Sequence, residues 1–251
     1  KEEKKLSKEK ILKNAKNEFD NLYNKLIKNK INVDVFNDRK KVRTTDSVFP
    51  NNWISLHQDG SVYVYPMFSE NRRKERRFDI IEKLKKQFEI KRVIDLSYFE
   101  IESVFLEGTG SMILDRQNKI CYAALSDRTN LIALNDFCNR ALYNSVTFKS
   151  YQNVEGKINL IYHTNVMMCI ADQYAIVCLD TIHNTKEREI LISSLEKTNK
   201  EIIDISEKQC NSFAGNMLQV SNTNDQKFLV MSSAAYKCLN TTQIKKILNY
   251  N

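Results

Sequence analysis

The first hydrophobic pattern along the chain has the spacing of a helix. Apolar residues recur three and four positions apart between residues 11 and 26, and Ser7 stands where it could cap that helix. Residues 31–36 then alternate as a strand would. Two further strand-like runs, 53–56 and 62–65, are separated by Gln58-Asp59-Gly60, and an Asp-Gly step between apolar runs indicates a β-hairpin.

The order strand, strand, helix, strand then recurs at a spacing of roughly fifty residues, a period typical of propellers and arrays. The first full copy continues with a helix over 78–88 and a strand over 93–96. The later strands are expected at 112–114, 121–125, 146–148, 165–170, 174–179, 202–205, 217–220 and 228–231, and the later helices at 131–142, 190–195 and 234–248. This pattern favours an α/β fold of about four to five modules in one domain, 1–251, incomplete at both ends; the alternative is chance alternation in a mixed α/β chain.

The composition fits a globular protein of the cytoplasm. Of the 251 residues, 42% are hydrophobic and 28% charged, no run is long enough to cross a membrane, and the charged N-terminus lacks an apolar signal region. The net charge of +8 is spread over the chain, and even the basic cluster 72–77 is better explained by solvation than by nucleic-acid binding. The six cysteines include no Cys-x-x-Cys pair, so a zinc site is not indicated, and a reduced intracellular setting fits best.

Polar residues that interrupt the apolar elements are the candidates for chemistry. The loop before the first hairpin carries Asp46 and Asn52, although Asp and Asn also make ordinary turns. Glu107 ends an apolar run and precedes Gly108 and Gly110, where the backbone can approach another group closely. The alternative there is a glycine-rich bulge with a solvated carboxylate.

A histidine and two arginines complete the candidate set. His163 precedes a buried strand and suits proton transfer, whereas His57 and His183 stand in turn-like contexts and are expected on the surface. Arg128 lies between a strand and a helix and could hold a carboxylate with its forked donors, as could Arg73. The alternatives are a structural histidine at a strand edge and surface arginines.

Four motifs in this order resemble the amidinotransferase/arginine-deiminase-like superfamily, and most of all its citrulline-utilisation hydrolase type branch. They are Thr45-Asp46-Ser47-Val48-Phe49-Pro50-Asn51-Asn52-Trp53, Glu107-Gly108-Thr109-Gly110-Ser111, Tyr162-His163-Thr164-Asn165-Val166-Met167-Met168 and Phe213-Ala214-Gly215-Asn216-Met217-Leu218. The resemblance covers nearly the whole chain. It implies the pentein fold, a pseudo-fivefold α/β propeller of strand–strand–helix–strand modules.

The resemblance also implies roles. Asp46 and Glu107 would bind a guanidinium group, and His163 would be the general acid/base. Arg128, with Arg72 or Arg73, would bind the substrate α-carboxylate. Asn52 and Asn165 would line the substrate site. Where the deiminases often carry His-x-Asp, this chain has Asn165, so one guanidinium-binding carboxylate is missing.

The expected activity is hydrolysis of the guanidino or ureido group of arginine, citrulline or a related amino acid, through a covalent cysteine adduct and without metal or organic cofactor. The family nucleophile is a cysteine in a glycine-rich segment near the C-terminus, and none of the six cysteines has that context. The nucleophile is therefore expected in the full gene product. The alternatives are a non-catalytic pentein that binds an amino acid or a protein partner, and an amidinotransferase. A homo-oligomer is left open.

Overall fold

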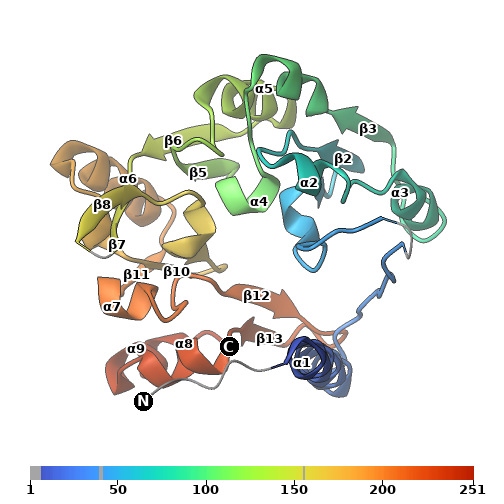
Figure 1. The fold of residues 1–251 in the computed structure, drawn as a ribbon. Helices are drawn as coiled ribbons and strands as arrows, with labels where there is room; N and C mark the ends of the chain where they lie inside the picture. Colours follow the sequence, from blue (N-terminus) through green and yellow to red (C-terminus); the bar gives the residue numbers. More distant parts are fainter. Residues whose placement is uncertain (1–6, 40–41, 155) are drawn as a thin grey trace.

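The computed structural model describes residues 7–39, 42–154 and 156–251. Four units built largely of two strands and a helix follow one another around the molecule in chain order, from blue-green to red (Figure 1). Modules 1, 2 and 3 each add a third strand after the helix, and module 4 ends in two helices. The structure therefore shows a mixed α/β fold assembled from small sheets.

The bounds of the modules match the expected order of elements. Module 1 comprises β1 (Ile54–Leu56), β2 (Ser61–Val64), α3 (Phe78–Leu84) and β3 (Arg92–Asp95). Module 2 comprises β4 (Ile113–Asp115), β5 (Ile120–Ala124), α5 (Leu131–Ala141) and β6 (Asn144–Phe148). Module 3 comprises β9 (Met168–Ile170), β10 (Tyr174–Val177), α6 (Thr185–Lys197) and β11 (Glu201–Asp204). Module 4 comprises β12 (Leu218–Ser221), β13 (Lys227–Val230), α8 (Ser233–Cys238) and α9 (Thr241–Leu248).

Shorter elements connect the modules. The helical ones are η1 (Pro50–Asn52), α2 (Glu70–Arg73), η2 (Ser97–Glu102), α4 (Gly108–Ser111), η3 (Thr164–Val166), η4 (Leu179–Thr181) and α7 (Glu207–Cys210). A hairpin of β7 (Tyr151–Val154) and β8 (Lys157–Leu160) follows module 2, and α1 (Lys8–Lys28) precedes module 1. The hairpin was not predicted, because its strands are largely exposed and carry no alternating apolar face.

The strand order explains why each module needs its helix. In modules 1 to 3 the second strand pairs antiparallel with the first and parallel with the third. A tight turn suffices for the antiparallel step, and Gly60 makes the predicted turn with a positive φ of 80°. The parallel step needs a crossover, which the helix supplies. Asn130 and Asn184 cap the crossover helices α5 and α6 by accepting backbone N–H groups.

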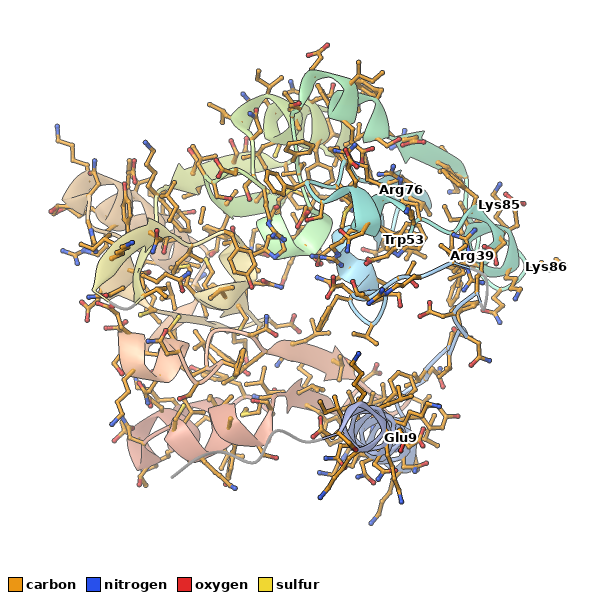
Figure 2. All side chains as sticks on the ribbon, viewed as in Figure 1. Glu9, Arg39, Trp53, Arg76, Lys85 and Lys86 are labelled. Carbon is orange, nitrogen blue, oxygen red and sulfur yellow. The ribbon has the colours of Figure 1, made fainter. Side chains whose placement is uncertain are left out.

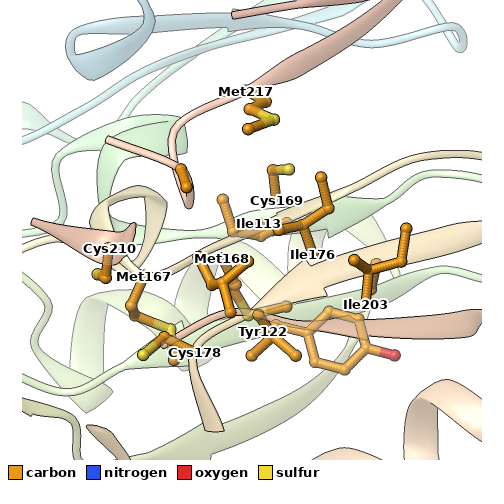
Figure 3. Packing of buried hydrophobic residues seen from close by; sticks show 14 of the residues in the cluster. Ile113, Tyr122, Met167, Met168, Cys169, Ile176, Cys178, Ile203, Cys210 and Met217 are labelled. Atoms are coloured by element: carbon orange, nitrogen blue, oxygen red, sulfur yellow. The ribbon is translucent and has the colours of Figure 1, made fainter. Parts of the chain in front are cut away.

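The core is divided among the modules. Every residue of the central strands β2 and β10 is buried, as their continuous apolar runs predict. The packing around module 3 is rich in sulfur, with Cys169, Cys178 and Cys210 beside Met167 and Met168 (Figure 3). All six cysteines are free thiols.

Four predicted elements differ from the structure. The strand expected over 165–170 begins only at Met168, because residues 164–166 form η3, and the helix expected over 78–88 ends at Leu84. No strand forms over 31–36, because no strand in the described residues accepts its hydrogen bonds. The helix expected over 234–248 breaks at Leu239 into α8 and α9, because the Asn240 side chain caps a new helix and forms a reciprocal capping box with Gln243.

Helix α1 stands apart from the core. Ser7 caps it as expected, yet none of its residues is buried. It lies beside the turn of the β12–β13 hairpin, where backbone atoms of Asn29 and Lys30 accept hydrogen bonds from Asn222 and Thr223 (Figure 1). The side chains of Lys85 and Lys86, which directly follow α3, project outward at the same edge of the molecule (Figure 2). Within the described ranges, no helix combines the length and apolar character required of a membrane span.

Candidate functional site

The turns that open the first strand of each module lie against one another. We call these the opening turns: η1, α4, η3 and the turn 213–217, for modules 1 to 4. Element α4 contacts both η1 and η3, and it lies toward the middle of the molecule (Figure 1). In the next pair, the Asn216 side-chain amide donates to the Asn165 carbonyl at 3.0 Å. The four sequence motifs that carry the resemblance are therefore the four opening turns and their flanks.

Glycines allow this close contact. A Cβ at Gly108, where φ is +47°, would lie 2.2 Å from the Asn51 carbonyl oxygen. A Cβ at Gly110 would lie 3.0 Å from the Asn52 Oδ1 atom and equally near the His163 ring, and one at Gly215 would lie 2.4 Å from a carbonyl of η3. The glycine pattern of the motifs thus reflects contact between modules.

Glu107 and His163 form a buried pair at the centre of this contact. The His163 Nε2 atom lies 2.6 Å from the Glu107 Oε2 atom, and the Glu107 side chain is fully buried. The same oxygen lies 3.4 Å from Nη1 of Arg128, while Oε1 accepts the Phe68 backbone N–H at 3.0 Å. Protein groups therefore occupy both carboxylate oxygens.

The electrostatics of the pair follow from burial and mutual contact. Burial alone would raise the pKa of Glu107, but the hydrogen bond from His163, its charge and the Arg128 charge together lower this pKa. Burial lowers the pKa of His163, and Glu107 opposes that shift only in part. Near neutral pH the pair consists of a carboxylate and a largely neutral imidazole, which is a base ready to accept a proton.

Two hydroxyl groups fix the backbone around the pair. The Thr164 hydroxyl donates to the Ser111 carbonyl at 2.5 Å and accepts the Ala124 N–H, so it ties η3 to α4 and β5. The Ser111 hydroxyl donates to the Arg128 carbonyl at 2.6 Å and accepts the Glu107 N–H. Sequence reasoning gave these hydroxyls no role, although both stand inside the recognised motifs.

The Asp46 loop is held separately. Asp46 is half-buried, and its side chain accepts a hydrogen bond from Thr45. In the described residues, no hydrogen bond or ion pair joins Asp46 to Glu107 or His163, so the structure brings only two of these three groups into direct contact.

Arg72 holds the Asp46 loop in place through hydrogen bonds to its backbone. Its guanidinium donates to the Asp46 and Phe49 carbonyls and pairs with the buried Glu75 carboxylate at 3.0 Å. The expectation that the basic cluster 72–77 is a solvated surface is wrong at Arg72, which is 5% exposed. The Glu75 carboxylate and the loop carbonyls accept the hydrogen bonds that the Arg72 guanidinium would otherwise donate to water.

The other expected site residues lie around this centre. Asn52 is buried and faces Gly110. Arg73 donates to the Met67 carbonyl, lies 3.5 Å from Glu100, and borders a surface hollow of about 510 Å³. Asn165 is half-buried in η3.

The other two histidines differ from each other. His183 is exposed, as expected, and stacks on Tyr151. His57 is not a surface group, because its Nε2 atom bonds the buried Ser55 hydroxyl at 2.8 Å and its ring packs against Tyr63. The polar residues that flank His57 in the sequence indicated a surface turn, and they gave no sign of the aromatic residues that the fold places against its ring.

Comparison with known proteins gives the family. A family model described as N,N dimethylarginine dimethylhydrolase, eukaryotic, matches residues 1–251. No curated protein sequence matches the chain.

Several solved structures share the fold. Apo ArgZ, an arginine dihydrolase from the ornithine–ammonia cycle in cyanobacteria, is 18% identical with a TM-score of 0.70, over 94% of this chain and 33% of the ArgZ chain. This chain thus spans about one third of ArgZ. The substrate-bound N-terminal domain of ArgZ, with a serine in place of a cysteine, is 18% identical with a TM-score of 0.67, over 92% and 74% of the two chains.

A dimethylarginine dimethylaminohydrolase variant in adduct with S-methyl-L-thiocitrulline is 16% identical with a TM-score of 0.59, over 93% of this chain and 78% of that one. At these identities the likeness shows the fold, a mixed α/β fold similar to the penteins. The family match adds the lineage. The chain belongs to the eukaryotic N,N-dimethylarginine dimethylhydrolase family of guanidino-group hydrolases, within the amidinotransferase/arginine-deiminase-like superfamily.

Proposed function

We propose that the protein hydrolyses a C–N bond in the guanidino or ureido group of arginine, citrulline or a related amino acid. The observation that carries this proposal is the buried Glu107–His163 pair, 2.6 Å apart, where three opening turns meet. A carboxylate-supported imidazole is the arrangement that acid–base catalysis at an amidine carbon requires. Structural neighbours are described with bound arginine, with substrate and with ornithine, which supports a small amino acid as ligand.

In the proposed mechanism His163 moves protons. Its neutral imidazole takes the proton of a cysteine thiol, and the Glu107 carboxylate stabilises the imidazolium that forms. The thiolate forms an S–C bond at the guanidinium carbon, and the C–N bond breaks as His163 returns its proton to the departing nitrogen. His163 then takes a proton from water, whose oxygen forms a bond to the same carbon, and the C–S bond breaks as His163 returns that proton to the cysteine sulfur.

The structure changes the role that we propose for Glu107. His163, Arg128 and Phe68 already donate hydrogen bonds to the two Glu107 oxygens. Glu107 therefore acts by supporting His163 and does not itself bind the substrate guanidinium. We propose Asp46 as the carboxylate that holds the guanidinium, supported by its half-buried position in a loop next to η1. Arg128 remains the proposed partner of the α-carboxylate.

The nucleophile in this proposal comes from outside the 251 residues. Cys121, Cys138, Cys169, Cys178 and Cys210 are buried. Burial raises the pKa of Cys169 to about 12, whereas hydrogen bonding with Cys121 and Cys178 lowers the pKa of Cys138 and of Cys210, respectively. In the described residues, no cysteine forms a hydrogen bond with His163. Support comes from two neighbours, a covalent reaction intermediate of the ArgZ N-terminal domain and the thiocitrulline adduct above.

The pentein propeller remains the proposed architecture. The arc of four modules supports it, with α1 placed between the last module and the first (Figure 1). Six free cysteines support a reducing, cytoplasmic setting.

Mass spectrometry of the intact full-length protein with a panel of guanidino and ureido compounds tests the function. We expect turnover of one of them, with a transient covalent adduct. His163→Ala should abolish turnover, whereas His183→Ala, which removes an exposed histidine, should leave turnover unchanged. Wild-type turnover in His163→Ala would contradict the proposal. Added acceptor amine that enters the product would indicate an amidinotransferase instead.

A further inference from the structure

Two aromatic rings enclose the guanidinium of Arg128. Its Cζ atom lies 5.4 Å from the Phe68 ring centroid and 5.1 Å from the Tyr162 ring centroid. Phe68 follows β2 of module 1, Arg128 follows β5 of module 2, and Tyr162 precedes η3 of module 3. Three modules thus contribute one side chain each to a single cluster, which we call the arginine bracket.

The bracket is built at the edge of the site. Phe68 and Tyr162 are 42% and 46% exposed, and Arg128 is 29% exposed, whereas the Glu107 side chain below them is fully buried. The Tyr162 ring also packs beside the His163 ring, with centroids 4.8 Å apart, and the Phe68 ring meets Phe105 edge-on. The bracket therefore borders the Glu107–His163 pair on a more exposed side.

The two aromatic rings contact Arg128 through cation–π interactions. Such contacts form at the ring faces and leave guanidinium N–H groups available for hydrogen bonds. Nη1 contacts Glu107, but no hydrogen bond joins Nε or Nη2 to any group in the described residues. Those donors suit a planar anion, and a carboxylate that accepts two parallel N–H groups is the best match.

We propose that Phe68 and Tyr162 are positioning residues that make the site selective for guanidino compounds carrying a carboxylate. They act through Arg128, because the rings fix its plane while its outer donors bind the carboxylate. This inference rests on the proposed function, since it concerns the ligand of the same site. The side chains alone are involved, because the backbone contacts of Phe68 and Tyr162 do not depend on their rings.

Calorimetry on the full-length protein with L-arginine and with agmatine, which is arginine without its carboxylate, tests the inference. We expect Phe68→Leu and Tyr162→Leu each to weaken arginine binding on the order of ten-fold and to leave agmatine binding unchanged. Tyr162→Phe keeps the ring and should keep the wild-type ratio of the two affinities. Tyr236→Leu, which removes an exposed aromatic ring of α8, is the matched control and should change neither.

The outcomes separate the inference from the function beneath it. If both leucine variants lose the two ligands equally, or lose neither, the positioning role is wrong while the function stands. The same holds if the wild-type protein binds arginine and agmatine equally well. If the wild-type protein binds neither compound nor any other guanidino amino acid, the proposed function is wrong, and the inference fails with it.

Discussion

Glu107 and His163 form one chemical unit at the level of single residues. The sequence indicated both side chains as candidates but gave Glu107 a direct contact with substrate. The contact between the two side chains could not be predicted, because this hydrogen bond joins residues 56 positions apart and depends on how α4 and η3 pack. Arg128 was likewise expected near substrate. Its two aromatic neighbours, Phe68 and Tyr162, were not predicted, since nothing in a sequence distinguishes a single exposed Phe or Tyr from others on the surface.

Glu107→Gln should separate the two functions of the carboxylate, its charge and its shape. The amide keeps the volume but removes the negative charge that raises the pKa of His163. We therefore expect the pKa of His163 to fall further in an NMR titration, and turnover to fall by roughly 100-fold, a size typical of lost acid–base support. An unchanged His163 titration would show that the contact has no electrostatic role.

His57 should make the fold sensitive to mild acid. Burial, followed by the Arg116 charge, lowers the pKa of His57 from 6.5 to about 4. The unfolded chain takes up a proton below pH 6.5 that the folded chain refuses, so this part of the stability is complete above pH 6.5 and is lost as the pH falls to 4. The loss is on the order of 2–3 kcal/mol, allowing for partial exposure.

The measurement is the free energy of unfolding in urea as a function of pH. In His57→Gln, which cannot titrate, we expect the curve between pH 6.5 and 4 to be flatter than that of the wild-type protein. Equal slopes in the two proteins would assign the acid sensitivity to other groups. His183→Gln, which removes an exposed histidine, is the matched control.

The opening turns are the elements that position the Glu107–His163 pair, since Glu107 directly precedes α4 and His163 directly precedes η3. Their motifs could be found in the sequence because glycine and short polar residues interrupt apolar runs there. Their mutual contacts could not be found, because the sequence does not show which turn meets which. The hairpins that open modules 1 to 4 and the crossover helices were predicted, since each depends on local patterns such as Asp59-Gly60, whereas the exposed β7–β8 hairpin was not. The strand at 31–36 failed because a strand also needs a partner.

Gly110→Ala tests the contact between turns. The added Cβ would lie 3.0 Å from Asn52 and from the His163 ring, so one of them must move by a few tenths of an ångström. We expect turnover to fall on the order of ten-fold or more, with a small change in melting temperature, because acid–base geometry tolerates less displacement than packing does. The readouts are steady-state kinetics and thermal unfolding of the full-length protein.

Gly156→Ala is the contrasting variant. Its Cβ would meet no atom within 4 Å, although its φ of +83° adds backbone strain of about 1 kcal/mol. It lies in the β7–β8 turn, so we expect the melting temperature to fall slightly and turnover to remain at the wild-type rate. Equal turnover of Gly110→Ala and the wild-type protein would argue against tight contact at the site.

Contacts between modules hold the molecule together as a whole. One is a buried ion pair between Asp115, at the end of β4, and Lys200, just before β11, with 3.2 Å between Nζ and Oδ2. Asp115 also accepts two hydrogen bonds from Asn118, and Lys200 donates to the Asp172 carbonyl. The modular order was visible in the sequence, but this pairing of residues 85 positions apart was not.

Lys200→Met and Asp115→Asn should each lower the free energy of unfolding by about 3 kcal/mol, because each leaves one buried charge without its partner. The double variant should lose much less than the sum. Urea unfolding of the wild-type protein and the three variants gives the coupling free energy. Additive losses would mean that the two charges contribute independently.

The contact of each opening turn with the next has an evolutionary consequence. A side chain at 108 or 215 would meet backbone atoms of residues 51–52 or 166–167, which no substitution there removes, whereas one at 110 would meet the side chains of Asn52 and His163. Among related sequences 108 and 215 should therefore stay glycine, and a change at 110 should be accompanied by a change at 52. A substitution in the opening turn of one module would therefore limit the substitutions that the opening turn of the next module can accept.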